Sequence, residues 1–266
     1  YNIYQTKRKE NITNMKILFT ICGRAGSKGI HNKNIKTFCE FPLPLYSLSA
    51  LDLYLTKHPE CDADIALNTD SLDLKEILCT NTKRNVYYIP RKHTLTGDFV
   101  AKKDVIKDTL IEMENLTHTS YEMVVDLDIT SPLRTVHDIE NLIQKFRDTS
   151  CDVVFSAVPS RRSPYFNMVY NNNGSFERII PTNFTARQEA PDVFDMNASL
   201  YAYRCEHLKA GYGALEGYNE LILMYDTAVL DLDHENDFTL MQVIAHFLFQ
   251  TNQEFNEVRC NILNLV

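Results

Sequence analysis

The stretch ILFTICGRAGSKGIHNKN, residues 17–34, decides the fold of this chain. Its first six residues are almost continuously apolar, which is typical of a short buried strand, so we predict a strand over Ile17–Cys22. Glycines then recur at Gly23, Gly26 and Gly29, where the absence of a Cβ lets backbone N–H groups approach an anion closely. A buried strand followed by such a loop is typical of the ligand-binding edge of an open α/β sheet.

The same loop concentrates positive charge. Arg24, Lys28 and Lys33 lie within it, although the whole chain has a net charge of -8. Arginine can bind phosphate through two parallel hydrogen bonds, and lysine acts as a mobile point charge. Only two residues separate Gly23 from Gly26, which excludes the P-loop spacing, and the dinucleotide-binding fingerprint is missing as well. We therefore predict a triphosphate-binding loop of another kind; a surface turn with hydrated charges is the alternative.

Downstream of this loop, apolar runs alternate with helical patterns. Further strands are predicted at 65–68, 86–89, 123–127 and 153–158, and helices at 44–57, 72–79, 99–114 and 136–147. Alternating strands and helices indicate a parallel sheet with right-handed crossovers. Because binding sites in such sheets lie beyond the carboxyl ends of the strands, we expect the loops after Cys22, Asn68, Ile89 and Leu127 to share one rim.

The alternation breaks over residues 159–191. An Asn-Gly pair at positions 173–174 lies between the apolar segments Met168–Tyr170 and Phe176–Ile180, which predicts a β-hairpin. We interpret residues 159–191 as a small inserted arm. The core is expected to comprise residues 15–158 and 192–266, and to resume with a strand over Met196–Tyr203, a strand ending near Leu232 and a final helix over Asn236–Phe249.

Composition narrows the class of protein. The chain has 266 residues, 44% hydrophobic and 23% charged, which suits one large domain with a sizeable core. The acidic balance disfavours a nucleic-acid surface, and no stretch is long and apolar enough for a membrane span. Residues 1–14 are expected to be a polar extension outside the fold. Seven cysteines, an odd number without a Cys-x-x-Cys pair, predict the reduced thiols of a cytoplasmic protein.

Four short motifs occur in an order that carries a family resemblance. They are residues 24–28 (RAGSK) with 33–34 (KN), residues 130–134 (TSPLR), residues 187–188 (RQ) with 197–201 (NASLY), and residues 231–233 (DLD). In this order they resemble the motifs of the acylneuraminate cytidylyltransferases, the CMP-sialic-acid synthetases. The forms DLDITSP at 126–132 and DMNAS at 195–199 look most similar to the branch that acts on legionaminic acid.

The resemblance implies a Rossmann-like nucleotide-diphospho-sugar transferase fold, CTP as donor, a sialic-acid-like acceptor, Mg²⁺, and a homodimer built by the arm. It implies catalytic phosphate contacts at Arg24, Lys28 and Lys33, and further nucleotide contacts at Gly23, Gly26, Ser27, Asn34 and Arg91. It places the acceptor near Asp128, Arg187, Gln188, Asn197 and Tyr201, and the metal at Asp231 and Asp233. A cytidylyltransferase for an eight-carbon acid sugar and a non-catalytic nucleotide-binding homologue are the alternatives.

The residues themselves add two expectations. On a strand, Asp231 and Asp233 would point to one face, and hard oxygen ligands of this kind suit Mg²⁺. Asp128 stands where the family usually has glutamine, and Lys102 where it usually has a small hydroxyl residue. An ionised aspartate only accepts hydrogen bonds, so we expect Asp128 to face donors, with its charge balanced by Lys102 or Arg134.

Overall fold

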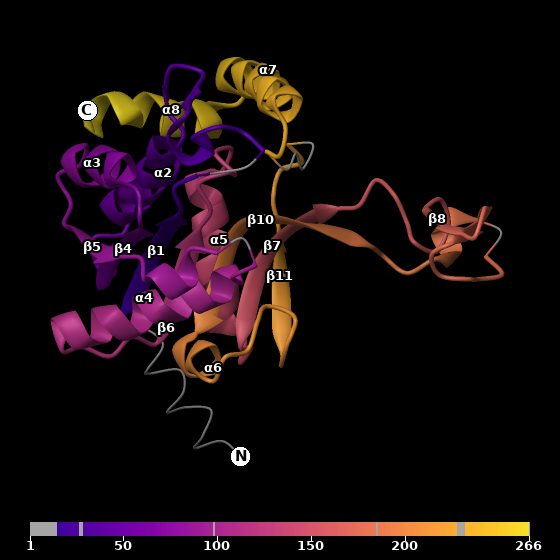
Figure 1. Ribbon diagram of the computed structural model, residues 1–266, viewed down its shortest axis with the longest axis horizontal. Coiled ribbons are helices and arrows are strands. Elements are labelled where there is room, and N and C mark those ends of the chain that lie inside the picture. Colours follow the sequence, from indigo (N-terminus) through magenta and orange to yellow (C-terminus); the bar gives the residue numbers. More distant parts are fainter. Residues whose placement is uncertain (1–14, 27–28, 98, 185, 228–231, 266) are drawn as a thin grey trace.

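The computed structural model describes residues 15–26, 29–97, 99–184, 186–227 and 232–265. A seven-stranded sheet forms the centre of the molecule, in the order β11-β7-β10-β6-β1-β4-β5 (Figure 1). Its strands are β1 (Ile17–Gly23), β4 (Ala63–Thr69), β5 (Val86–Pro90), β6 (Met123–Leu127), β7 (Val153–Pro159), β10 (Phe194–Arg204) and β11 (Asn219–Leu223). The α-helices are α2 (Pro44–Lys57), α3 (Leu72–Thr80), α4 (Lys102–Thr117), α5 (Val136–Asp148), α6 (Cys205–Lys209), α7 (Glu235–Thr251) and α8 (Gln253–Leu265).

The sheet is mostly parallel, as expected from the alternation of elements. Strand β1 lies parallel to both β4 and β6, β4 is parallel to β5, and β7 is parallel to β11. Strand β10 is the exception, because it runs antiparallel between β6 and β7. The short strands β2 (Thr37–Phe38) and β3 (Phe41–Pro42) form a separate pair that leads into α2. The α/β architecture predicted from the sequence is therefore confirmed.

Helices cover both faces of this sheet. Side chains of β1 alternate between the faces, so Phe19 and Ile21 pack with the helices α2, α3, α5, α7 and α8, whereas Leu18 and Cys22 face α4 and α6. Both clusters are almost fully buried, and they form the core on the two faces of the sheet. Helix α5 begins with a capping box, in which the Thr135 hydroxyl and the Asp138 carboxylate each bind the other residue's backbone N–H.

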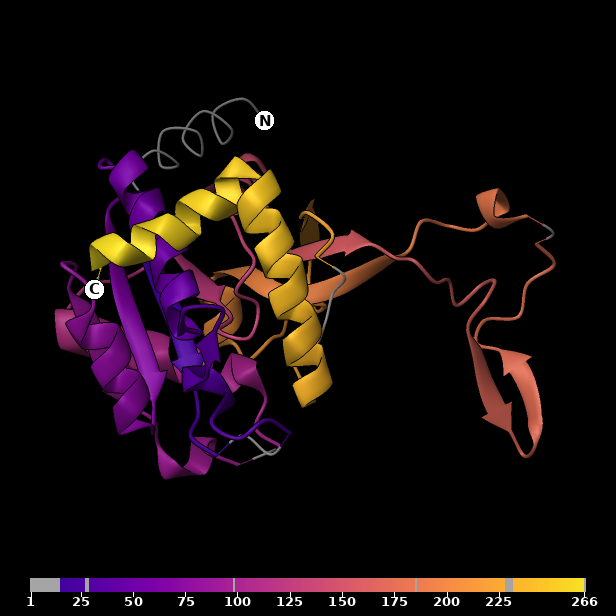
Figure 2. The same cartoon turned by 90° about the horizontal axis from the view of Figure 1, so that it is seen from above.

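An arm projects from the core between β7 and β10 (Figures 1 and 2). It ends in a hairpin of β8 (Val169–Asn172) and β9 (Ser175–Arg178), whose turn places Asn173 and Gly174 at φ angles of 52° and 95°. A two-residue hairpin turn of this type requires positive φ at both central positions, and an Asn-Gly pair meets that requirement. Large apolar side chains are exposed along the arm: Phe166, Met168, Val169, Tyr170, Phe176, Ile179 and Ile180.

The structure differs from the sequence-based expectations in the last third of the core. The strand predicted to end near Leu232 falls mostly outside the described residues, and Leu232–His234 form a turn that leads into α7. Among the residues that the structure describes, the last strand is β11, which pairs with β7. Helix α7 is followed by α8, which the sequence analysis did not predict and which packs on α2, where the Ser49 hydroxyl donates to the Val258 carbonyl at 2.6 Å.

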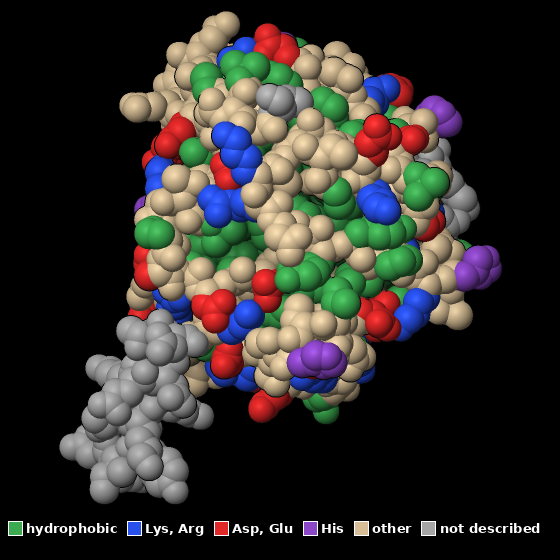
Figure 3. Space-filling model, turned by 90° about the vertical axis from the view of Figure 1, so that its left-hand side faces the viewer, with side chains coloured by type: hydrophobic (Ala, Val, Ile, Leu, Met, Phe, Trp, Pro, Cys, Tyr) green, Lys and Arg blue, Asp and Glu red, His purple; other side chains and the backbone are tan. Residues whose placement is uncertain are grey.

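Two further features concern the surface and the thiols. All seven cysteines are free, as predicted. In the part of the chain that the structure describes, no helix has both the length and the apolar character needed to cross a bilayer. On the face shown in Figure 3, acidic and basic side chains are intermixed rather than gathered into one basic field. This face therefore lacks the electrostatic footprint of a nucleic-acid-binding surface.

Candidate active site

A cavity of about 370 Å³ opens at the carboxyl ends of β1, β5 and β6. The loops that follow these strands share this rim, as the parallel topology predicts. Its lining combines the glycine-rich loop, the segment before α4, the start of α4 and the turn before α7. The lining residues are Cys22, Gly23, Arg24, Gly29, Lys33, Asn34, Arg91, Leu95, Gly97, Val100, Lys102, Val105, Asp128, Thr130 and Asp233.

The glycine-rich loop leaves β1 through a tightly packed position. A Cβ on Gly23 would lie 2.5 Å from Leu74 Cδ2 and 2.8 Å from Ile129 Cδ1, so a larger residue here would displace buried side chains. Beyond it, the Asn34 amide donates a hydrogen bond of 3.0 Å to the carbonyl of Arg24. Asn34 thus fixes the backbone of the loop, in addition to any contact with a ligand.

The second half of the loop contacts its neighbours through the backbone. Gly26 has a φ of +68°, which favours glycine, and the Ala25 N–H donates to Asp70 Oδ1 at 2.7 Å. A Cβ on Gly29 would lie 2.1 Å from the carbonyl oxygen of Asp233. The loop therefore lies directly against the turn before α7. Two predicted site residues of the loop, Ser27 and Lys28, lie outside the described residues.

Asp233 lines the cavity, but not as the sequence predicted. It lies in the turn before α7 rather than on a strand, so the alternation argument for Asp231 and Asp233 does not hold for the described residues. Lys33 connects this turn to the loop, since its ammonium donates to the Leu232 carbonyl at 2.7 Å and lies 3.7 Å from Asp233 Oδ1. Asp231 itself lies outside the described residues.

The carboxylate of Asp233 suits a magnesium ion. Its side chain is 69% exposed at the cavity, next to the loop that carries Arg24 and Lys33. In the described ranges, no group of three or more His, Cys, Asp or Glu residues could hold a metal. Mg²⁺ is commonly bound by one or two carboxylates and completed by water and substrate phosphates, so a single described carboxylate beside a glycine-rich, positively charged loop fits this ion.

Arg91 also lines the cavity. Its guanidinium donates from Nε to Asn68 Oδ1 at 2.9 Å and from Nη2 to the Asn68 carbonyl at 3.1 Å. Burial lowers the pKa of Arg91 from its ordinary high value. The nearby wall is apolar and consists of Leu95, Val100 and Val105. This side of the cavity combines a fixed guanidinium with the apolar surface that a flat ring requires.

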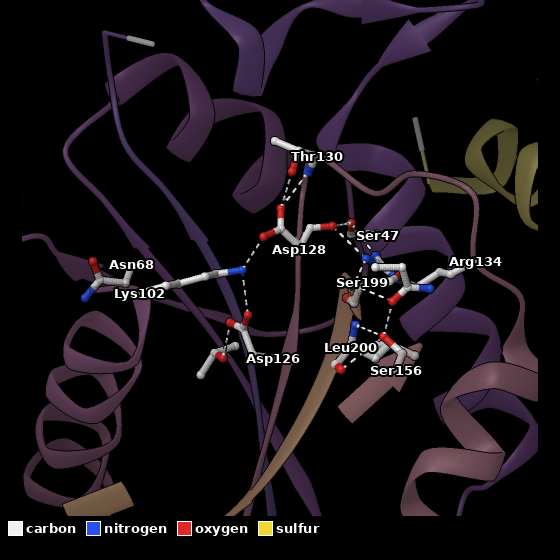
Figure 4. Close-up of polar contacts among 12 residues, drawn as sticks. Ser47, Asn68, Lys102, Asp126, Asp128, Thr130, Arg134, Ser156, Ser199 and Leu200 are labelled. Carbon is white, nitrogen blue, oxygen red and sulfur yellow. Dashed lines mark hydrogen bonds and ion pairs between the residues drawn. The ribbon is translucent and has the colours of Figure 1, made fainter. Parts of the chain in front are cut away.

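The floor of the cavity is an ion triad (Figure 4). The Lys102 ammonium lies 2.7 Å from Asp126 Oδ2 and 2.6 Å from Asp128 Oδ2. The other oxygen of Asp128 accepts hydrogen bonds from the Thr130 backbone N–H and hydroxyl, both at 2.8 Å. Asp126 also accepts a hydrogen bond of 2.7 Å from Thr20. Lys102 is the cation that pairs with Asp128, as expected.

These contacts explain the ionisation of the triad. Burial opposes the charge of Asp128, but the Lys102 ammonium and the Thr130 donors outweigh it and lower the pKa of Asp128 to about 2. Burial also opposes the charge of Lys102, yet Asp126 and Asp128 hold its pKa above the ordinary value. The stability that Asp128 gains from its depressed pKa is therefore present at neutral pH and lost only as the pH falls toward the folded pKa.

Arg134, the other cation expected to balance the charge of Asp128, has a different role. It is fully buried, and it donates to the hydroxyls of Ser47 and Ser199 at 2.6 and 3.2 Å. Its Nη2 also donates to the carbonyls of Asp128 and Ser199 at 2.7 and 2.9 Å. Burial lowers the pKa of Arg134 to about 10, so the group stays charged at neutral pH. Arg134 thus fixes the backbone of Asp128 rather than pairing with its carboxylate.

The other predicted acceptor residues whose side chains are described do not line this cavity. Gln188 lines a separate cavity of about 360 Å³ at the base of the arm. Asn197 accepts from the Ser156 hydroxyl at 2.6 Å, and Tyr201 stacks on Tyr203. The side chain of Arg187 lies outside the part of the chain that the structure describes. Of the predicted acceptor contacts, the structure brings Asp128 alone to the described lining of the nucleotide-side cavity.

Lys102 and Asp126 were absent from the predicted binding residues. A signal for them was present, because Asp126 lies on β6 and Asp128 directly follows its last residue, Leu127, so the alternation of a strand carries both to the same side. Two carboxylates at the end of a buried strand require a cation. The sequence suggests Lys102 or Arg134 and does not decide between them, because Lys102 meets the carboxylates only through the packing of α4 on the sheet.

Comparisons with known proteins agree with this architecture. The chain is 34% identical over 230 residues to the CMP-N,N'-diacetyllegionaminic acid synthase of Campylobacter jejuni, which covers 86% of this chain and 94% of that protein. It is 33% identical, with the same coverage, to the post-translational flagellin modification protein B of Campylobacter coli. An N-acylneuraminate cytidylyltransferase of Streptococcus agalactiae is 24% identical over 88% of this chain and 54% of its own length. No family model matches.

Two solved structures are similar to this chain in their fold. A CMP:2-keto-3-deoxy-manno-octonic acid synthetase in complex with CTP superposes with a TM-score of 0.58 at 15% identity, covering 88% of this chain and 99% of that one. A 4-diphosphocytidyl-2C-methyl-D-erythritol synthase from Anaerococcus prevotii gives 0.59 at 12% identity, covering 87% and 99%.

Fold and cavity together define a nucleotidyltransferase architecture with its ligand edge at the carboxyl ends of the parallel strands. By its identity to the Campylobacter proteins over most of both chains, the protein belongs to the acylneuraminate cytidylyltransferase family, in the branch that contains the legionaminic acid synthase.

Proposed function

We propose that the protein transfers CMP from CTP to the anomeric hydroxyl of a nonulosonic acid and releases pyrophosphate. The observation that carries this proposal is the cavity in which the glycine-rich loop, Arg91 and the Asp233 turn meet at the carboxyl edge of the sheet. The relatives named as cytidylyltransferases and synthases supply the substrate classes.

In this reaction the sugar oxygen forms a bond to the α-phosphorus of CTP, and the bond to the pyrophosphate oxygen breaks. By their positions in the sequence, Arg24, Lys28 and Lys33 can neutralise the phosphates of CTP. The backbone at Gly23 and Gly26 lets these phosphates lie close to the loop. A Mg²⁺ ion held by Asp233, with Asp231, would add positive charge at the leaving pyrophosphate. Most of the rate enhancement then comes from positioning and charge neutralisation.

The acceptor is proposed to be legionaminic acid or a related sugar with two acylamino groups. Asp128 accepts two hydrogen bonds on Oδ1 and one on Oδ2, which leaves capacity on Oδ2 for one further donor. An amide N–H of the sugar is such a donor. A bare carboxylate of the sugar acid would be repelled by Asp128, so the acid group must lie elsewhere.

We expect kcat/KM for N,N'-diacetyllegionaminic acid to exceed that for N-acetylneuraminic acid by at least about 10-fold, because the hydrogen bond to a charged acceptor is lost with the wrong sugar. The measurement is pyrophosphate release with CTP and each sugar in turn. Asp128→Asn should reduce the ratio of the kcat/KM values for the two sugars. Equal values for both sugars, or preference for an eight-carbon acid sugar, would contradict the legionaminic assignment, and no release with any of them would contradict the cytidylyltransferase.

We also propose that the protein is a homodimer held through the arm. The arm carries exposed apolar side chains, with Phe176 70% and Val169 58% accessible, and the core of the same chain does not cover them (Figure 2). Exposed apolar patches of this kind commonly meet a partner.

Sedimentation at micromolar concentration should therefore show two chains. The double change Val169→Asp with Phe176→Asp should give monomers, because it places charges in the proposed interface. Leu263→Asp is the matched control: Leu263 is 65% exposed but lies on α8 of the core, so this variant should remain dimeric. A wild-type monomer under these conditions would refute the proposal.

A further inference from the structure

Strand β10 contains a wide bulge opposite Ser156 of β7. The pairing of the two strands shifts between Met196 and Tyr201, so the segment 197–200 stands opposite Ser156 alone. Within this segment Ala198 has a φ of 52°, a left-handed conformation that residues other than glycine rarely adopt. Bulges and strained backbone concentrate beside functional sites, and neighbouring groups must hold them in place. The contacts that hold this bulge therefore bear on the site.

The hydroxyl of Ser156 replaces the backbone pairing that the bulge interrupts. It accepts a hydrogen bond from the Leu200 N–H at 2.9 Å and donates to Asn197 Oδ1 at 2.6 Å. The same Asn197 oxygen accepts from the Ser199 N–H at 3.3 Å. Because Ser156 is only 1% exposed, bulk water does not compete for these hydrogen bonds. A single hydroxyl thus connects the first and the last residue of the bulge.

The bulge in turn supports the backbone of Asp128. The Ser199 carbonyl accepts hydrogen bonds from the Asp128 N–H at 3.1 Å and from Arg134 Nη2 at 2.9 Å (Figure 4). Arg134 Nη2 also donates to the Asp128 carbonyl at 2.7 Å. The N–H of Asp128 therefore binds the bulge directly, and its carbonyl is linked to the bulge through Arg134. A shift of the bulge would move the Asp128 carboxylate within the cavity.

We propose that Ser156 is a positioning residue for the acceptor side of the site, because its hydroxyl holds the bulge that sets the place of Asp128. This inference rests on the proposed function and extends it to a residue that is not part of the described lining of the cavity. Ser156 acts through Asn197, Ser199 and Asp128 and does not touch a substrate. The glycine-rich loop leaves from β1, outside this chain of contacts, so the effect falls on the sugar more than on CTP.

The test begins with Ser156→Ala, which removes the hydroxyl and leaves a small buried side chain. We expect KM for N,N'-diacetyllegionaminic acid to rise about 10-fold, because a contact far from the reacting atoms still sets their placement. KM for CTP should stay within about threefold of wild type. Pyrophosphate release, with one substrate varied at a time, measures both values.

Ser49→Ala is the matched control. The Ser49 hydroxyl is also fully buried, donates to the Val258 carbonyl at 2.6 Å and accepts from the Asn261 amide at 3.3 Å, but it lies on α2. Ser49→Ala should lose a similar free energy of unfolding in urea and keep both KM values. A similar rise of the sugar KM in both variants would show a general loss of packing and overturn the role of Ser156.

A double-mutant cycle with Asp128→Asn tests the route of the effect. If Ser156 acts through the Asp128 carboxylate, Ser156→Ala should raise the sugar KM by less than about twofold once Asp128→Asn is present, because members of one network are not additive. Additive effects, or an Asp128→Asn variant with an unchanged sugar KM, would overturn the proposal.

Asn197→Ala provides a second variant, so the test does not depend on whether Ser156→Ala folds. Asn197 is only partly buried and supplies the oxygen that Ser156 binds. This variant should show the same rise in sugar KM and the same dependence on Asp128. An additive loss here would show a direct contact of Asn197 with the sugar and overturn the positioning role. Wild-type protein that releases no pyrophosphate with CTP and any acid sugar would instead overturn the proposed function.

Discussion

Replacing Asp233 by asparagine is expected to reduce kcat by about 100-fold or more while leaving the fold intact. Asp233 is the described carboxylate that lines the cavity next to the glycine-rich loop, and its side chain is largely exposed, so no buried contact is lost. An asparagine keeps the shape but removes the charge that a divalent cation needs. The steady-state rate at saturating CTP, sugar and Mg²⁺ measures the effect.

A nearby carboxylate provides the matched control. Glu235 lies two residues further on, is exposed, and pairs with Lys36 at 3.0 Å rather than lining the cavity. Glu235→Gln should therefore keep its activity within about threefold of wild type. Mn²⁺ binding in the presence of CTP, followed by electron paramagnetic resonance, gives a readout that is independent of turnover. If Asp233→Asn binds Mn²⁺ as wild type does and retains its rate, Asp233 does not hold the metal.

Arg134→Met is expected to lower the free energy of unfolding by about 3–5 kcal/mol, measured by urea denaturation. The guanidinium is fully buried and satisfies Ser47, Ser199 and the carbonyl of Asp128 at once. Methionine has a similar length but no donors, so buried oxygens on three segments lose their partner. Because the Asp128 carbonyl is one of these oxygens, the variant should also change how the reaction rate depends on the acceptor sugar.

Arg204 allows this effect to be separated from the loss of an arginine in general. It lies on β10, the strand that also carries Ser199, donates to the Cys151 carbonyl at 2.9 Å and packs over the Phe146 ring, but it is only partly buried. Arg204→Met should cost about 1 kcal/mol. Similar losses for both variants would show that Arg134 is an ordinary packed side chain rather than the organiser of this loop.

The part of the fold that could be predicted is the part specified by local sequence. Strand β6 and helix α2 have the predicted bounds, because a continuous apolar run and an apolar face with proline at its start are unambiguous local signals. The shared rim followed from parallel topology alone. Of the nucleotide-side residues that the family motifs predict, Gly23, Arg24, Lys33, Asn34 and Arg91 line one cavity, and Gly26 does not. Their contact with a nucleotide stays a prediction.

The rest depends on contacts between distant segments. The alternation of Asp231 and Asp233 suggested a strand, but Leu232–His234 turn toward α7, where Lys33 binds the Leu232 carbonyl. The motif at 187–188 appears beside the acceptor motif in sequence, yet Gln188 lies at the base of the arm. The ion triad arises because α4 brings Lys102 to β6, and no periodicity along the chain encodes that meeting.

The direction of β1 has a practical consequence for handling the protein. The strand enters the sheet at Ile17 and reaches the cavity at Cys22 and Gly23, so its first residue lies at the opposite edge from the binding site. The arm leaves from the cavity edge, because β7 ends and β10 begins there. A surface tether joined ahead of Met15 would therefore immobilise the molecule from its far edge, with the cavity and the arm both turned toward the solution.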